Sequence, residues 1–90
     1  MKGIKIGDKV KWLSYKDLAP IERMGTVIAI VPKGESANKH IPSTAKKTHI
    51  KFDLDVSTID RVIVAVAAGA DGQITHYYGR PSGTVELIEN

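Results

Sequence analysis

Residues Met24–Pro32 read MGTVIAIVP, an apolar run that a glycine opens and a proline closes. In a β-strand, Val27, Ala29 and Val31 would point to one side and the isoleucines between them to the other. Both sides of this strand are apolar, so we expect both to be covered. The glycine at its start marks a bulge or a close approach of another backbone. The rest of the chain reads as strands that pair with this one or as loops that leave it.

Five further runs have the composition or the two-residue alternation of strands. Ser14–Arg23 reads instead as a loop, with one helical turn at Ser14–Leu18, because Pro20 excludes a regular helix. Asp71-Gly72 is a hairpin signal between two of the runs. The sequence therefore predicts one all-β domain over residues 1–90, with five or six mostly antiparallel strands in a barrel or small sandwich. The five runs are Ile4–Trp12, Thr48–Asp53, Arg61–Ala67, Gln73–Tyr78 and Thr84–Ile88.

Composition and charge narrow the class of protein. The chain has 90 residues and no cysteine, which excludes disulfides and thiolate metal sites. No apolar stretch approaches the roughly 20 residues that span a membrane, and the start MKGIKIGDKV lacks a signal-peptide core. We therefore expect a soluble cytoplasmic protein with no membrane partner. Residues 1–51 hold eleven Lys or Arg and four Asp or Glu, whereas residues 52–90 hold two and six. Such an asymmetry suits an anionic ligand or head-to-tail self-association.

The longest break between strands is a basic loop, Pro32–Lys47. A loop of this length in a small domain is usually functional or disordered. Lys46 and Lys47, with His49 just beyond, are of the residue types that contact phosphate as point charges. The alternative is a flexible loop whose charges are simply solvated.

A second candidate for phosphate binding is the segment GRPSGT at residues 79–84. In a glycine-containing turn, backbone N–H groups, the guanidinium of Arg80 and the hydroxyls of Ser82 and Thr84 would converge on phosphate oxygens. Tyr78 precedes the segment and could stack on a base, as could Trp12. The alternatives are an ordinary turn between strands and, for Trp12, core packing with its indole N–H satisfied locally.

No motif points to an enzyme. The spacing of His40, His49 and His76 matches no compact metal site, and no nucleophile or phosphate-loop motif is present. His49 and His76 could form an acid–base pair with a lysine, as in a nuclease, but each also reads as an ordinary strand histidine. We expect no catalytic residue, no metal and no cofactor.

Two segments carry a resemblance to known families. Gly7-Asp8-Lys9-Val10, followed after an irregular stretch by the run from Gly25 to Ile30, resembles the opening of SH3-like, KOW-type barrels. The chain also looks like a group of short phage and prophage proteins, in which a Tyr-Trp-Pro-Arg type run is more usual near the end. The segments that carry this likeness are Gly7–Trp12, Gly25–Gly34, Arg61–Val66 and Tyr77-Tyr78-Gly79-Arg80-Pro81. The likeness covers about half of the chain. It implies an SH3-like barrel of five to six strands with one long basic loop. It also implies RNA or protein binding, or a small accessory protein that counters a host defence.

Two expectations follow for function and assembly. Arg61–Ala67 has two apolar faces, more than one thin barrel needs, so we expect one face to lie in a homo-oligomer interface. The function expected is non-enzymatic binding of an anionic ligand, either nucleic acid or a nucleotide phosphate. The alternative is a phage-type protein in the host cytoplasm that sequesters a cyclic nucleotide signal or inhibits a host defence protein by direct binding.

Overall fold

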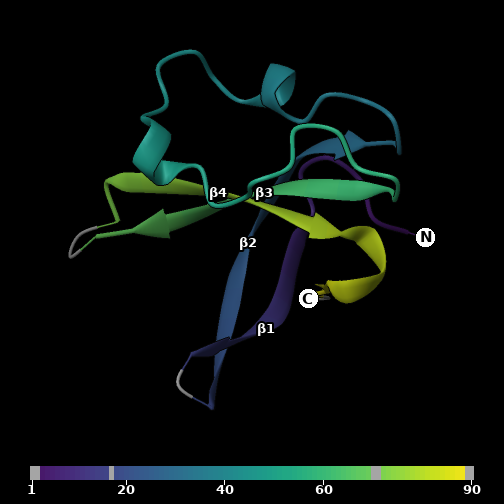
Figure 1. Ribbon diagram of the computed structural model, residues 1–90. Helices are drawn as coiled ribbons and strands as arrows, with labels where there is room; N and C mark the ends of the chain where they lie inside the picture. The colour runs from purple at the N-terminus through teal and green to yellow at the C-terminus, as the bar shows by residue number, and fades with distance from the viewer. Residues whose placement is uncertain (1–2, 17, 70–71, 89–90) are drawn as a thin grey trace.

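Five antiparallel strands form one open sheet in the order β4-β3-β2-β1-β5 (Figure 1). The computed structural model describes residues 3–16, 18–69 and 72–88. Within them no helix is long and apolar enough to cross a bilayer. The all-β, antiparallel prediction is confirmed, but the sheet does not close on itself. The strands are β1 Lys9–Lys16, β2 Ala19–Val31, β3 Arg61–Ala68, β4 Ile74–Pro81 and β5 Glu86–Leu87, and the 3-10 turns are η1 Asn38–His40, η2 Lys47–His49 and η3 Ser82–Thr84.

The first two strands form a long hairpin that projects from the sheet (Figure 1). They pair without interruption from Lys9↔Thr26 to Lys16↔Ala19. The loop predicted at 14–23 is therefore wrong, although Asp17 lies outside the described residues. Pro20 is tolerated because β3 pairs only with Thr26–Val31 of β2. The other edge of β2 near Pro20 therefore needs no N–H for a ladder.

A β-bulge in β2 divides the strand between two faces of the sheet. Val27 pairs with Val64, and the next paired residue, Ala29, stands opposite Ile63, so that Ile28 is the extra residue. A bulge reverses the alternation of side chains beyond it. The prediction that Val27, Ala29 and Val31 share one face is therefore wrong.

Two apolar clusters result, one on each face of the sheet. The first lies on the concave face, where the sheet curls, and contains Val10, Trp12, Val27, Val62, Val64 and Val85. The second lies on the other face and contains Ala29, Val31, Ala37 and Ile63, with Phe52 and Tyr77 packed against it. Ala37 and Phe52 belong to the long segment between β2 and β3, which thus covers this face. The second apolar face of β3 therefore has a partner within the chain, and self-association remains a separate, untested prediction.

Hydrogen bonds, three of them partly buried, tie the long segment between β2 and β3 to the sheet. Arg61, only 5% exposed, begins β3. Its Nη1 donates to the carbonyl of Leu54 at 2.6 Å and its Nη2 to that of Asp55 at 2.8 Å. The carboxylate of Asp55 accepts from the Ser36 hydroxyl at 2.6 Å and from the Asn38 N–H at 2.9 Å. The two ends of the segment are thereby tied together and to the sheet.

The end of this segment differs from the prediction of a strand at Thr48–Asp53. Lys47–His49 forms the turn η2 instead, and Ile50 makes a single parallel bridge to Tyr77 of β4. The Lys51 N–H donates to the Tyr77 carbonyl at 2.7 Å. Phe52 faces inward as predicted, into the second cluster. The hairpin predicted at Asp71-Gly72 is reflected in the antiparallel pairing of β3 with β4, and Asp71 itself lies outside the described residues.

We expect the stability of the fold to depend on pH through Asp55. Its pKa is lowered by the hydrogen bonds from the Ser36 hydroxyl and the Asn38 N–H and by the charge of Arg61, against partial burial, which raises it. A lowered pKa contributes stability that is present above the unfolded-state value, roughly 4, and is lost as pH falls through the folded-state value. Asp55→Asn should therefore be less stable than wild type at pH 7, and the difference should shrink by pH 3.

Denaturant unfolding at both pH values measures this difference. Asp53→Asn, at an exposed carboxylate in the same segment, is the control and should unfold like wild type at pH 7. An equal loss for Asp55→Asn at pH 7 and pH 3 would contradict the role of the ionised carboxylate.

Candidate functional site

Two arginines and two aromatic rings form a stack on the concave face, which we call the arginine–aromatic cluster: Arg23, Tyr78, Trp12 and Arg80. The guanidinium carbon of Arg23 lies 5.3 Å from the centre of the Tyr78 ring. Tyr78 meets Trp12 edge to face, with ring centres 5.4 Å apart and an interplanar angle of 61°. The guanidinium carbon of Arg80 lies 5.9 Å from the centre of the Trp12 ring. Each cation therefore rests on an aromatic face, a favourable arrangement for a guanidinium.

Strand register brings these four residues together. Trp12 of β1 stands directly opposite Arg23 of β2, so both side chains lie on one face. On β4, Tyr78 and Arg80 stand opposite Val64 and Val62, two members of the concave cluster. Alternate residues of a strand share a face, so both project into the same concavity. The curl of the sheet then brings β1 and β4 within contact distance, although they are not neighbours in the sheet.

Two buried donors of the cluster have no acceptor. The Nε of Arg80 and the indole Nε1 of Trp12 are buried and have no hydrogen-bond partner among the described residues. The Arg80 side chain also forms no ion pair there, because the ion pairs found join Glu35 to Lys39 and to His40. Buried donors are normally paired. These two atoms are closed to a ligand in this arrangement, but the Arg80 side chain is only partly buried. Its guanidinium therefore offers positive charge without a counter-charge to an anion.

The two aromatic residues proposed from sequence have different roles. Trp12 is 3% exposed, so no base can stack on it in this arrangement, and core packing is what the structure gives. Its indole N–H, expected to be satisfied locally, has no partner in the described residues. Tyr78 is partly buried, between Trp12 and Arg23. The rings support the guanidinium groups, and the arginines are the groups that a ligand would meet. Guanidinium planes can themselves stack on bases.

The segment at 79–84 does not form the phosphate loop that its sequence predicts. β4 continues through Pro81, so the predicted turn at 79–83 is wrong over its first half. Gly79 is a strand residue, and a Cβ there would lie 3.0 Å from the Phe52 ring. The Thr84 hydroxyl donates to the Pro81 carbonyl at 2.7 Å and the Ser82 hydroxyl to the Asp60 carbonyl at 3.5 Å. These hydroxyls are engaged with backbone, and Arg80 alone of this segment belongs to the cluster.

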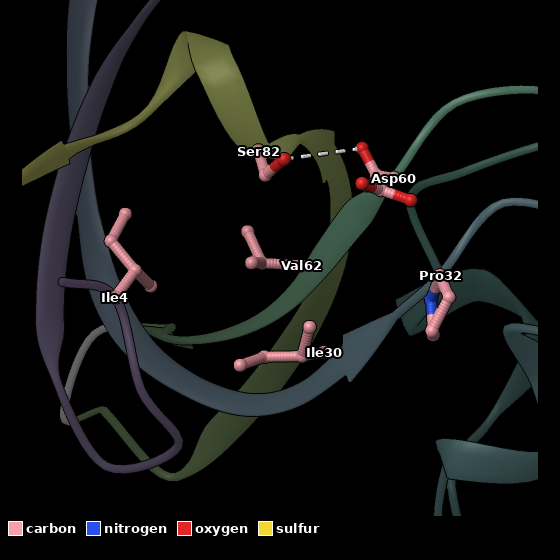
Figure 2. A pocket seen from close by; sticks show the side chains of 6 residues that line it. All are labelled: Ile4, Ile30, Pro32, Asp60, Val62 and Ser82. Carbon is pink, nitrogen blue, oxygen red and sulfur yellow. Dashed lines mark hydrogen bonds between the residues drawn. The ribbon is translucent and has the colours of Figure 1, made fainter. Parts of the chain in front are cut away.

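Ser82 lies instead at a separate pocket at one end of the concave face (Figure 2). The pocket has a volume of about 180 Å³ and is lined by Ile4, Ile30, Pro32, Asp60, Val62 and Ser82. Its walls are mostly aliphatic, and its one charged group is the Asp60 carboxylate. A carboxylate repels anions, so this pocket does not suit the ligand expected from sequence.

The basic residues of the long segment gather beside β4. Lys46 and His49 line a shallow groove with Thr75 and Tyr77 of β4, and Lys46, Lys47 and His49 all belong to or adjoin η2. Figure 1 shows η2 close to the strand. His49 also approaches His76, with ring centres 5.3 Å apart. These residues therefore adjoin the strand that carries Tyr78 and Arg80.

Two residues of the site were missed from sequence, Arg23 and His76. Arg23 was assigned to a loop, and only a strand at 14–23 would have placed it opposite Trp12. His76 was considered as half of an acid–base pair or as an ordinary strand histidine, and not as part of a binding site. Its pKa is lowered by burial first and then by the positive charges of Lys51, His49 and Arg23. Arg23 thus connects the arginine–aromatic cluster to the basic residues beside β4.

No protein-family model, curated protein or solved structure matches this chain. No relative therefore supplies a ligand for the site. Within residues 3–16, 18–69 and 72–88, no group of three His, Cys, Asp or Glu side chains is placed to hold a metal ion. The chemistry available to a ligand at the arginine–aromatic cluster is that of two guanidinium cations on aromatic rings.

Proposed function

We propose that the protein is a non-enzymatic binding module that captures an anionic ligand, a nucleic acid or a nucleotide phosphate, at the arginine–aromatic cluster. The observation that carries the proposal is Arg80, whose guanidinium rests on Trp12. Its Nε has no hydrogen-bond partner and its side chain forms no ion pair among the described residues. A partly buried cation without a counter-charge costs free energy. An anion bound against it would remove that cost and gain charge-assisted hydrogen bonds.

The strand order supports a finer proposal for the fold. A meander from β1 to β4, with β5 returning beside β1, is the arrangement expected of a partly open SH3-like barrel. The contact of Trp12 with Tyr78 across the concave face supports that closure through side chains. We place the protein in the cytoplasm, the host cytoplasm if it is encoded by a phage.

Binding should depend on Arg80. Arg80→Ala is expected to weaken binding by roughly 1.5–3 kcal/mol, the range for a hydrogen bond to a charged group, which is about 10- to 150-fold. Trp12 is the only tryptophan of the chain and adjoins Arg80. Its fluorescence can therefore follow titration with single-stranded oligonucleotides, mononucleotides and cyclic nucleotides.

Lys39→Ala is the matched control, because it removes the same charge from a side chain that is 61% exposed and pairs with Glu35. Its affinity for the ligand should be within about twofold of that of wild type, because exposed ion pairs contribute little free energy. An affinity for longer oligonucleotides that falls steeply with salt concentration identifies nucleic acid as the ligand. Salt-tolerant, stoichiometric binding of a small nucleotide identifies signal sequestration instead. Equal affinity of Arg80→Ala and wild type would remove Arg80 from the site.

A second candidate, direct inhibition of a host protein, is favoured by the projecting hairpin. Residues 19–25 of β2 pair with β1 but not with β3, so one strand edge is open for strand addition. Leu13 is 51% exposed, Leu18 98% and Met24 55% on the same hairpin. If no nucleic acid or nucleotide binds in the titrations above, this surface is the one to test against host proteins.

A further inference from the structure

Two histidine rings meet at the outer edge of β4, away from the Arg80 end of the cluster. His49 ends η2 and His76 lies on β4, with ring centres 5.3 Å apart and an interplanar angle of 41°. The approach is fixed by backbone: the Lys51 N–H donates to the Tyr77 carbonyl at 2.7 Å, and Ile50 bridges to Tyr77. The imidazole pair is therefore part of the fold.

The charges that act on the His76 ring are all of one sign. The groups whose charges act on His76 are Lys51 and His49, from the segment beside β4, and Arg23, from β2. No carboxylate appears among them. The Nε of Arg23 donates to the Ser14 hydroxyl at 3.2 Å, which leaves its two Nη groups available. Basic groups, and no carboxylate, thus act on His76, although Asp53 lines a neighbouring groove with Lys51. This environment disfavours a metal cation between the imidazoles and favours an anion.

We propose that His49, His76, Lys51 and Arg23 form a phosphate subsite that takes a terminal phosphomonoester dianion and takes up a proton as it binds. The inference rests on the proposed function for its class of ligand, nucleotide or nucleic acid, and adds that the ligand ends in a phosphate. A phosphomonoester carries nearly two negative charges at neutral pH, with a second pKa near 6. A phosphodiester carries one, so the excess of cations selects the chain end or the mononucleotide.

Proton uptake follows from the environment of His76. Burial and the positive charges of Lys51, His49 and Arg23 lower the pKa of its imidazole, which favours the neutral form in the empty site. A bound dianion reverses the local field and stabilises the imidazolium. The pKa of His76 therefore rises on binding, and by linkage the affinity must rise as pH falls. This rise in affinity should be measured between pH 8 and pH 6.5, above the pH at which the phosphate itself takes up a proton.

The test compares a short single-stranded oligonucleotide that carries a 5′-phosphate with the same strand ending in a 5′-hydroxyl, and AMP with 3′,5′-cyclic AMP. We expect the terminal phosphate to strengthen binding about tenfold at pH 6.5, with charge-assisted hydrogen bonds as the cause, and less at pH 8. Calorimetry in two buffers of different ionisation enthalpy should show proton uptake. The strand pair tests a chain end as the source of the phosphate, and the nucleotide pair tests a free nucleotide.

His76→Gln and His49→Gln should each abolish the gain from the phosphate and the proton uptake. His40→Gln should keep both the gain from the phosphate and the proton uptake, because His40 lies in η1 and contacts Glu35 instead. Equal affinity for 5′-phosphate and 5′-hydroxyl strands, together with equal affinity for AMP and its cyclic form, would overturn the subsite. The proposed function would survive if those ligands still bind in an Arg80-dependent way.

A titration with inorganic phosphate, followed by the ring proton signals of His76 and His49 in NMR, tests the subsite even if no nucleotide binds. Shifts of both rings, with the pH titration of His76 displaced upward, support the subsite. Unshifted rings at millimolar phosphate would overturn it.

Discussion

Arg61→Ala should destabilise the protein more than any other single change of a charged residue. We expect a loss of about 3 kcal/mol in the free energy of unfolding, because the carbonyls of Leu54 and Asp55 each lose one charge-assisted hydrogen bond, at 2.6 and 2.8 Å. The Asp55 carbonyl keeps its second bond, from the Ala37 N–H. A domain of this length is stable by only roughly 5–13 kcal/mol. The melting temperature should fall by roughly 15 °C, measured by circular dichroism and checked by urea unfolding.

The effect should extend beyond Arg61 itself. The segment from Pro32 to Asp60 covers Ile63 on the second face of the sheet. The Arg61 side chain of β3 donates two hydrogen bonds to the backbone of this segment. Amide hydrogen exchange in Arg61→Ala should therefore rise first at Ala37 and Asn38, whose N–H groups donate to the backbone and side chain of Asp55.

Lys33→Ala, at an exposed residue whose backbone N–H donates to the Asp60 carboxylate, is the control and should stay within about 0.5 kcal/mol of wild type. Arg61→Met keeps the buried volume but supplies no hydrogen-bond donor. If hydrogen bonding dominates, its free energy of unfolding should be close to that of Arg61→Ala. An Arg61→Ala protein as stable as wild type would show that the segment is held by its apolar contacts alone.

Apolar periodicity predicted the parts of this fold that depend on local sequence. The runs around Val27 and around Val64 are strands, and both carry apolar residues on two faces, as observed. Gly25 was expected to mark a bulge or a close backbone approach. The bulge lies at Ile28, and at Gly25 the Ala65 carbonyl oxygen lies 2.5 Å from the position a Cβ would take. These features follow from side-chain alternation and backbone sterics, which neighbouring residues determine.

Features that depend on distant pairing could not be read in this way. The bulge at Ile28 depends on how β2 pairs with β3, and it reverses the faces assigned to Ala29 and Val31. Ser14–Arg23 has no apolar period and contains Pro20, so local propensity favours a loop. Its first residues extend β1 and its last residues begin β2, and the two ends pair with each other as a hairpin. Tertiary pairing commonly overrides local propensity in this way.

The candidate site was predictable only in part, for the same reason. Arg80, Tyr78 and Trp12 were identified by residue type, but sequence placed Arg80 in a loop and Trp12 as a possible base platform. Their stacking arises because the sheet curls until β1 and β4 meet, a property of the whole sheet. Arg23 joins the cluster through the hairpin that sequence did not predict, so the second cation of the site could not be anticipated.

Gly25→Ala should have the second large effect, and it tests the curl that builds the site. A Cβ at Gly25 would lie 2.5 Å from the Ala65 carbonyl oxygen, 2.6 Å from Val64 Cγ1 and 2.9 Å from Val66 Cγ2. The nearest of these atoms is backbone, so β2 or β3 must move. We expect a loss of about 3 kcal/mol in the free energy of unfolding, the upper part of the range for overpacking.

Gly83→Ala is the matched control, because a Cβ there meets nothing within 4 Å and Gly83 has an ordinary negative φ. It should be neutral or slightly stabilising, since alanine reduces the entropy of the unfolded chain. Gly25 stands opposite Val10, two residues from the Trp12–Arg23 pair, so a shift of β2 against β3 should also separate Tyr78 from Trp12. Folded Gly25→Ala protein should therefore show altered tryptophan fluorescence and weaker ligand binding than Gly83→Ala. Stability and fluorescence equal to wild type would mean that the close approach at Gly25 does not maintain the curl of the sheet.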